Sequence, residues 1–183
     1  MDSELFNEYK AYYRELHDQG KFSGGSLKAK YIPQIKALVQ KTGSRTLLDF
    51  GCGKAHNYTK SHINRAFGIK DGNVSLYDPG YEQYEDMPEG QFDCLICTDV
   101  MEHIPEELID ETLQTMFSKC TKFAFIVIHC GLADKVLPNG ENAHITVKPP
   151  DWWKQKIIEN KGLQMVQLKF IIPSDPKKNI LGL

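Results

Sequence analysis

Five short apolar runs constrain the fold of this chain more than any other feature. They lie at residues 45–50, 73–78, 92–98, 122–128 and 163–172. All are rich in Val, Ile, Leu and Phe, and several lack the polar alternation of a half-exposed strand. Such runs are typical of parallel strands that helices cover on both faces. Helical patterns at 105–120 and 149–162 separate the later runs, so the sequence predicts an α/β fold with a doubly wound, mostly parallel sheet.

Two further helical patterns precede the first run. Residues 3–18 carry leucines and tyrosines at helical spacings, and residues 26–43 end in Gly43, which suits a helix C-cap. A chain of 183 residues is long enough for one domain with a core and short for two. We therefore expect residues 1–183 to form a single domain with residues 1–43 as an N-terminal helical cap. The helix at 3–18 and the loop 22–26 are expected to close over a binding site as a lid.

Charge and hydropathy narrow the environment of the protein. The formal net charge is −2, so no overall positive field attracts a nucleic-acid backbone. One local basic cluster consists of Lys10, Arg14, Lys21, Lys28 and Lys30. No stretch approaches the ~18 unbroken apolar residues of a membrane span, and the N-terminus lacks the features of a secretory signal. We expect a cytoplasmic protein that makes no membrane contact.

The five cysteines are an odd number and sit mostly inside apolar runs. This placement favours reduced thiols in a core over a disulfide framework. Cys94 and Cys97 form a Cys-x-x-Cys pattern, but they fall in a predicted strand. Residues three apart on a strand point to opposite faces, so this pair is not expected to share a metal.

The first apolar run leads into a glycine loop, LLDFGCGKAH at residues 47–56. In open parallel sheets, ligands bind beyond the carboxyl ends of the strands. A dinucleotide fold requires a third glycine where this chain has His56, and a P-loop requires a hydroxyl residue where Ala55 follows Lys54. Asp78, at the end of the second run, can accept hydrogen bonds from both hydroxyls of a ribose. Loop and acid together indicate an adenosine-type ligand without phosphates.

At these residues the sequence resembles the class I S-adenosylmethionine-dependent methyltransferases. Their first motif is an apolar strand, an acid and Gly-x-Gly, as at Asp49, Gly51 and Gly53. Asp78 matches their ribose-binding acid, and residues 92–105, FDCLICTDVMEHIP, resemble their fourth-strand motif. The resemblance implies a Rossmann-like fold with S-adenosyl-L-methionine as cofactor. The cofactor-binding residues that it implies are Asp49, Gly51, Cys52, Gly53, Asp78, Pro79, Thr98 and Asp99.

One departure from the family concerns the edge of the sheet. Only 13 residues separate Asp78 from Phe92, whereas a crossover takes at least ~10–12 residues before the next strand is counted. The sequence therefore predicts a shortened edge that lacks a full third strand. The family's adenine-binding acid follows that strand, so neither Glu85 nor Asp86 can be assigned this role. The alternative candidates for adenine contact are Pro79, Tyr81 and Tyr84.

A second group of residues can carry chemistry. Asp99, Glu102 and His103 fall at i, i+3 and i+4, so their side chains would converge on a helix. Together with His144, or alternatively His129, they form a predicted divalent-metal set for Mg²⁺, Mn²⁺ or Zn²⁺. This pattern resembles that of metal-dependent O-methyltransferases, in which the metal holds and acidifies a substrate hydroxyl. Without a metal, His144 or His129 is the candidate general base.

The long irregular segment at 129–153 is expected to be functional because loops of this length are uncommon in compact domains. Of its adjacent Trp152 and Trp153, one should face the pocket or solvent. The leading hypothesis is methyl transfer to an oxygen or nitrogen of a small molecule. The alternatives are an RNA or DNA methyltransferase acting on a 2′-hydroxyl or a base, with a basic surface beside its pocket, and a non-catalytic cofactor-binding accessory protein.

Overall fold

A computed structural model describes residues 3–22, 25 and 27–173. Five strands alternate with helices along this part of the chain. The strands are β1 (Leu47–Phe50), β2 (Val74–Tyr77), β3 (Phe92–Thr98), β4 (Cys120–His129) and β5 (Met165–Ile171). The α-helices are α1 (Glu4–Asp18), α2 (Ile32–Thr42), α3 (His56–Thr59), α4 (Ile63–Phe67), α5 (Ile109–Ser118) and α6 (Pro150–Asn160). The 3₁₀ helices are η1 (Ala29–Tyr31), η2 (Asp71–Asn73), η3 (Glu82–Tyr84), η4 (Met101–His103) and η5 (Glu106–Leu108).

The strands form one sheet in the order β2-β1-β3-β4-β5, and every neighbouring pair is parallel. All five apolar runs become strands, so the predicted α/β fold with a parallel sheet is confirmed. The chain passes from β1 outward to β2 and then back across β1 to β3. This reversal creates a switch point between β1 and β3, where open α/β sheets bind their ligands.

The shortened edge is also confirmed. The described residues between Tyr77 and Phe92 contain the 3₁₀ helix η3 and no strand. Strand β2 therefore forms the edge of the sheet. The backbone of this connection folds back on itself, because the N–H of Asp78 donates to the carbonyl of Tyr84 over 2.8 Å.

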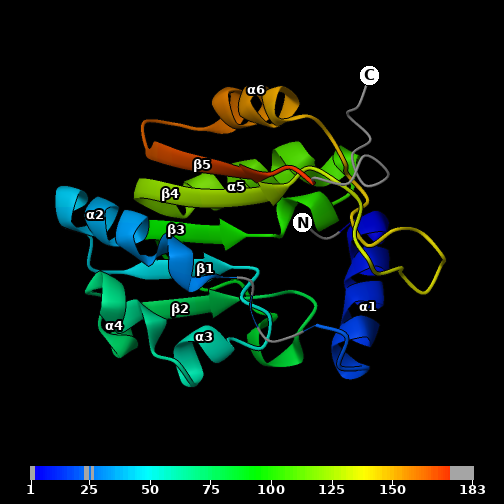
Figure 1. Ribbon diagram of the computed structural model, residues 1–183, viewed down its shortest axis with the longest axis horizontal. Helices are drawn as coiled ribbons and strands as arrows, with labels where there is room; N and C mark the ends of the chain where they lie inside the picture. Colours follow the sequence, from blue (N-terminus) through cyan, green and yellow to red (C-terminus); the bar gives the residue numbers. More distant parts are fainter. Residues whose placement is uncertain (1–2, 23–24, 26, 174–183) are drawn as a thin grey trace.

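Helices cover both faces of the sheet (Figure 1). Residues of α2, α3 and α4 pack in one buried cluster, and residues of α5 and α6 pack in the other. Within β3, Cys94 belongs to the first cluster and Cys97 to the second. The two thiols therefore point to opposite faces, as predicted, and all five cysteines are free and buried.

Local signals account for the ends of two N-terminal helices. The side chain of Ser3 caps α1 by accepting a hydrogen bond from the N–H of Phe6 at 3.1 Å. Helix α2 ends at Gly43, whose φ of +59° is the left-handed C-cap that the sequence predicts. Helix α5 departs from expectation, since Pro105 precedes the 3₁₀ helix η5 and the α-helix begins only at Ile109.

Helix α1 stands across the carboxyl ends of the strands, whereas α2 lies along one face of the sheet (Figure 1). Two basic side chains of α1, Lys10 and Arg14, form ion pairs with Glu85, the Lys10 pair at 2.8 Å. At the other side, the Tyr9 hydroxyl donates to Glu141 at 2.7 Å. These contacts hold α1 over the strand ends. Among the described residues, no helix combines the length and apolar character needed to span a bilayer.

Candidate functional site

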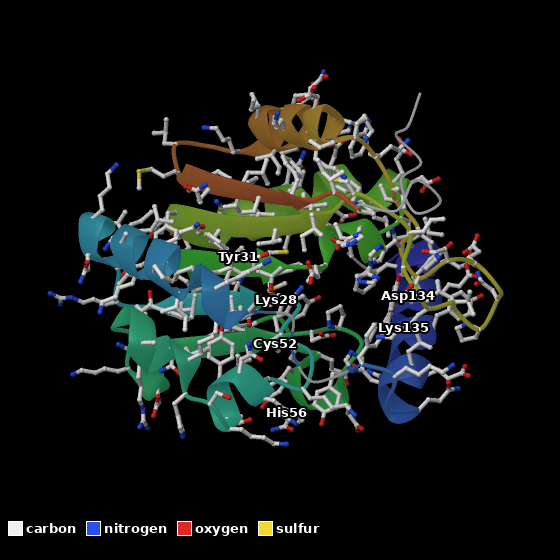
Figure 2. The ribbon with its side chains drawn as sticks, viewed as in Figure 1. Lys28, Tyr31, Cys52, His56, Asp134 and Lys135 are labelled. Carbon is white, nitrogen blue, oxygen red and sulfur yellow. The ribbon has the colours of Figure 1, made fainter. Side chains whose placement is uncertain are left out.

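A cavity of about 630 Å³ lies between the carboxyl ends of the strands and α1. Pockets that bind small molecules have volumes of roughly 300–1,000 Å³. Its wall combines α1 with the loops that follow β1, β2, β3 and β4. Figure 2 shows Lys28 near the strand ends and Asp134 and Lys135 on the long loop after β4, and all three line the cavity. The segments that the sequence marks as functional therefore meet in one place.

The glycine loop after β1 is packed too tightly for a side chain. Gly51 has a φ of +84°, and a Cβ added there would lie 2.2 Å from Cγ2 of Val100. The N–H groups of Gly51 and Cys52 both donate to the carbonyl of Tyr77, at 2.7 and 3.1 Å. The neighbouring strand and Val100 thus fix the backbone, and Gly51 and Gly53 line the cavity without side chains that would obstruct a ligand.

Asp78 ties the glycine loop to the turn after β2. One carboxylate oxygen accepts the N–H of Gly53 at 2.7 Å, and the other accepts the N–H of Gly80 at 2.9 Å. Burial raises the pKa of Asp78. Each oxygen keeps a further lone pair, and Asp78 lines the cavity. The residue can therefore accept hydrogen bonds from a ligand diol while it holds the loop.

The eight predicted cofactor-binding residues divide into two sets. Those that line the cavity are Gly51, Gly53, Asp78, Pro79 and Asp99. Asp49, Cys52 and Thr98 are buried and do not contribute to the described wall. Asp49 lies beneath the loop, where burial raises its pKa to about 7 and the neighbouring Tyr58 hydroxyl opposes that rise. Its position suits support of the loop better than contact with a ligand.

The raised pKa of Asp49 predicts that the stability of the fold depends on pH. A carboxyl with a folded pKa of about 7 and an unfolded pKa of ~3.9 binds more protons when folded. Stability therefore falls as pH rises from ~4 to ~7, by up to ~4 kcal/mol. In urea denaturation, Asp49→Asn should gain stability relative to the wild type between pH 5 and pH 8. For the control Asp151→Asn, at an exposed position, the free energy of unfolding should change with pH as it does in the wild type. The same pH dependence in Asp49→Asn would contradict the raised pKa of Asp49.

Glu102, His103 and His144 form a cluster beside the cavity. One ligand atom from each lies within 4.8 Å of the others. The helix predicted for residues 99–103 is wrong, because only the 3₁₀ helix η4 forms and Asp99 takes a left-handed φ of +53°. Asp99 therefore lies outside the cluster, with its carboxylate 3.6 Å from the ammonium of Lys28.

The two histidines of the cluster are held in one tautomer. His103 Nδ1 lies 2.6 Å from the carbonyl of Ala143, and His144 Nδ1 lies 2.6 Å from the carbonyl of Gly131. Burial lowers the pKa of His103 to about 3 and also lowers the pKa of His144, so both rings are neutral at pH 7. Because a carbonyl only accepts, each Nδ1 donates, and each Nε2 keeps a lone pair for a ligand.

Glu102 is fully buried. Its Oε1 accepts the N–H of His129 at 3.0 Å. Its Oε2 has no hydrogen-bond partner in the described part of the chain. Burial, and the nearby Asp99, raise the pKa of Glu102 well above its usual value. A buried carboxyl oxygen without a partner is costly, so this atom is a candidate ligand group.

Helix α1 helps to assemble the cluster. The Tyr13 hydroxyl lies 2.9 Å from the carbonyls of both His103 and Ala143, and its ring packs edge-on against His103. Hydrogen bonds within the long loop after β4 hold its shape. The side-chain amide of Asn142 accepts from the N–H of Ala133 and donates to the carbonyl of Ala133, both at 2.9 Å. His129 packs against His144 with ring centroids 4.9 Å apart. The loop therefore delivers histidines to the cavity from defined positions.

Several other sequence expectations can be located. Of the two tryptophans of α6, Trp153 is fully buried. Trp152 is half-buried, packs against lysines and does not belong to the described cavity wall. Tyr81 and Tyr84 are also absent from that wall, whereas Pro79 belongs to it. In the predicted lid loop, Phe22 and Gly25 line the cavity, and Ser23, Gly24 and Ser26 lie outside the described residues. Wall residues that the sequence did not single out include Phe6, Leu27, Leu108 and Pro173.

The strand order and the glycine loop after β1 define a Rossmann-like fold, with Asp78 at the end of β2 facing the cavity. A family model described as a methyltransferase domain matches residues 14–168, most of the chain, so the chain belongs to this family. Membership identifies a class I S-adenosylmethionine-dependent methyltransferase domain and implies S-adenosylmethionine as its cofactor. The search of curated proteins returned no match to the sequence.

Proposed function

We propose that the protein transfers a methyl group from S-adenosylmethionine to an oxygen or nitrogen of a small molecule. The observation that carries this proposal is that α1 stands across the strand ends and forms one wall of the cavity, which histidines also line. Lys10 and Arg14 share the one carboxylate of Glu85, and Lys28 pairs with Asp99, so the positive charge of the basic cluster is offset in part. A cavity of this volume, with α1 as one wall and a basic cluster that is partly offset, suits a small acceptor better than a nucleic-acid backbone.

The cavity fits the cofactor that the family implies. Gly51 leaves backbone exposed where a Cβ could not fit, and the Asp78 carboxylate faces the same space. We propose that Gly51, Gly53, Asp78, Pro79 and Asp99 hold the cofactor. When bound, the cofactor supplies a methyl group that its sulfonium has already activated. The chain's own part is to align the acceptor for in-line attack and to exclude water beneath α1.

The proposed general bases are His144 and His129, which both line the cavity. His144 holds its Nδ1–H on the carbonyl of Gly131, so its Nε2 is the atom that can receive a proton. Burial lowers the pKa of His144 and makes it a weak base. A weak base suits an acceptor hydroxyl that is already acidic, such as a phenol, and His144 can serve as the base only while its Nε2 holds no metal.

We also propose that Glu102, His103 and His144 hold a divalent metal. The support is the proximity of their ligand atoms, the free Oε2 of Glu102 and the carbonyl bonds that orient both rings. Two imidazoles and one carboxylate favour Zn²⁺ or Mn²⁺ over Mg²⁺, which prefers oxygen ligands. A bound metal of this kind would hold and acidify an acceptor hydroxyl.

The metal proposal is tested by metal analysis and titration calorimetry. The wild type is expected to bind one Zn²⁺ or Mn²⁺ per chain, and His144→Ala should bind at least about tenfold more weakly. His56→Ala is the matched control, because His56 heads α3 away from the cluster. Equal metal affinity in the wild type and His144→Ala would contradict the proposal that His144 binds the metal.

The acceptor class is tested with methyl-labelled cofactor and a cell extract separated by ultrafiltration. Label should pass into the small-molecule fraction, and His144→Ala should lower the rate about 10²–10⁴-fold if His144 is the base. Label in the RNA or DNA fraction, with transfer that falls steeply as salt rises, would favour the nucleic-acid alternative. Failure to bind the demethylated cofactor, S-adenosylhomocysteine, would contradict the enzyme proposal altogether.

A further inference from the structure

His17 lies in the last turn of α1, next to the acid that faces the cavity. Its side chain is buried, with the residue only 6% exposed, yet it forms part of the cavity wall. The Nε2 atom lies 4.0 Å from Oδ1 of Asp78. Its Nδ1 is buried and has no hydrogen-bond partner among the residues that the structure describes. Nε2 is therefore the ring nitrogen that faces Asp78 and the cavity wall, and its Nε2–H is the donor available to a ligand in the tautomer that leaves Nδ1 unprotonated.

The separation of His17 and Asp78 allows one hydroxyl oxygen, placed to the side of the line between them, to reach both. A separation of 4.0 Å is too long for a direct hydrogen bond. An oxygen placed ~2.8 Å from both atoms would make an angle of roughly 90° between them, which a hydroxyl can adopt. A hydroxyl can donate to the carboxylate of Asp78 and accept from an N–H of His17. Burial lowers the pKa of His17, so the neutral ring carries one N–H for this purpose.

The position of His17 is fixed from several sides. Its ring packs between Phe22 and Tyr81, with centroid distances of 5.0 and 5.5 Å. Its backbone carbonyl accepts a hydrogen bond from the ammonium of Lys54 at 3.0 Å, and this bond links the end of α1 to the glycine loop. A Cβ on Gly80 would lie 3.5 Å from Cδ2 of His17. The helix therefore packs directly against the turn that carries the ribose-accepting acid.

We propose that His17 is a cofactor-binding residue and that a ribose hydroxyl of the cofactor binds between its imidazole and the carboxylate of Asp78. This inference rests on the proposed function, because it concerns the same cofactor. It adds a contact from α1, which lies outside the motifs of the glycine loop and strand ends. Because His17 belongs to the helix that covers the cavity, the cofactor's own ribose stabilises the closed position of α1.

The test is calorimetric titration of the full chain with S-adenosylhomocysteine and with its 2′-deoxy and 3′-deoxy forms. His17→Leu should bind S-adenosylhomocysteine about tenfold more weakly than the wild type, as expected for one lost hydrogen bond in a buried site. For the deoxy form that lacks the bridging hydroxyl, the wild type and His17→Leu should bind equally. His17→Gln keeps an N–H donor and should recover most of the affinity. Tyr12→Phe, on the same helix and outside the described cavity wall, should match the wild type.

The outcomes separate this inference from the proposed function. If the wild type does not bind S-adenosylhomocysteine, the proposed function fails. If the wild type binds it and His17→Leu loses nothing, or loses the same factor for all three ligands, His17 does not contact the ribose. If His17→Leu folds poorly, as judged by circular dichroism, the comparison of the wild type with His17→Gln and His17→Asn replaces it, and loss of the bridging hydroxyl should cost the donor-bearing proteins affinity. Equal wild-type affinity for all three ligands shows that no ribose hydroxyl bridges His17 and Asp78 and overturns the inference.

Discussion

Asp78→Ala is expected to weaken S-adenosylhomocysteine binding at least about 100-fold, the largest effect of any single side chain in the site. Its carboxylate accepts the N–H groups of Gly53 and Gly80, and the substitution leaves both without that acceptor. The loop after β1 loses its tie to the turn after β2, and the ribose loses its acceptor. Two to three hydrogen bonds of roughly 1 kcal/mol or more each correspond to a loss of this size.

Calorimetric titration measures the Asp78 effect, and circular dichroism checks that the fold persists. Asp86→Ala is the matched control, because Asp86 lies on the same connection but outside the described cavity wall. It should bind within about threefold of the wild type, since surface substitutions rarely exceed ~0.5 kcal/mol. Binding by Asp78→Ala within that same range would show that this acid does not hold the cofactor.

Gly51→Ala is expected to destabilise the fold by more than about 3 kcal/mol and to abolish cofactor binding. The added methyl group would lie 2.2 Å from Cγ2 and 2.9 Å from Cγ1 of Val100, and the φ of +84° is itself strained for alanine. Val100 and the glycine loop cannot both keep their positions. The loop must therefore move out of the geometry in which Asp78 holds it.

Gly68→Ala separates backbone strain from the steric clash. Gly68 has a similar φ of +91°, but a Cβ there meets nothing within 4 Å. Its substitution should cost only the strain, about 1–2 kcal/mol. The double variant Gly51→Ala, Val100→Ala should recover part of the lost stability, since the nearest remaining atom is Cβ of Val100 at 3.2 Å. Urea denaturation gives each value, and equal costs at Gly51 and Gly68 would refute the clash.

The sheet could be predicted because its signals are local. Each strand is a short apolar run, and the central strands β1, β3 and β4, which lack polar alternation, are largely buried on both faces. The 13 residues between Asp78 and Phe92 were too few for another helix and strand, and the structure has neither an α-helix nor a strand there. Chain length alone was enough for that inference, because backbone geometry limits what a segment can span.

Helix α1 was predictable, but its contacts with the rest of the fold were not. An aromatic helix near the N-terminus can be read from the spacing of Tyr9 and Tyr13, but their partners cannot. Glu85 was considered for adenine, and the structure instead pairs it with Lys10 and Arg14 of α1. Long-range ion pairs of this kind depend on which surfaces the fold brings together. No pattern within α1 or within the η3 connection specifies that meeting.

By itself, the sequence determined the fold class, the glycine loop and the acid at the end of β2, because periodicity and special backbone positions act over a few residues. Tertiary structure decided which side chains share the cavity. His103 and His144 come together through Tyr13 and the carbonyls of Ala143 and Gly131. Asp99, only three residues from Glu102 and still close enough to affect its pKa, lies outside the cluster because its backbone takes a left-handed φ. Contacts between loops depend on hydrogen bonds between distant segments, and helical spacing does not encode them.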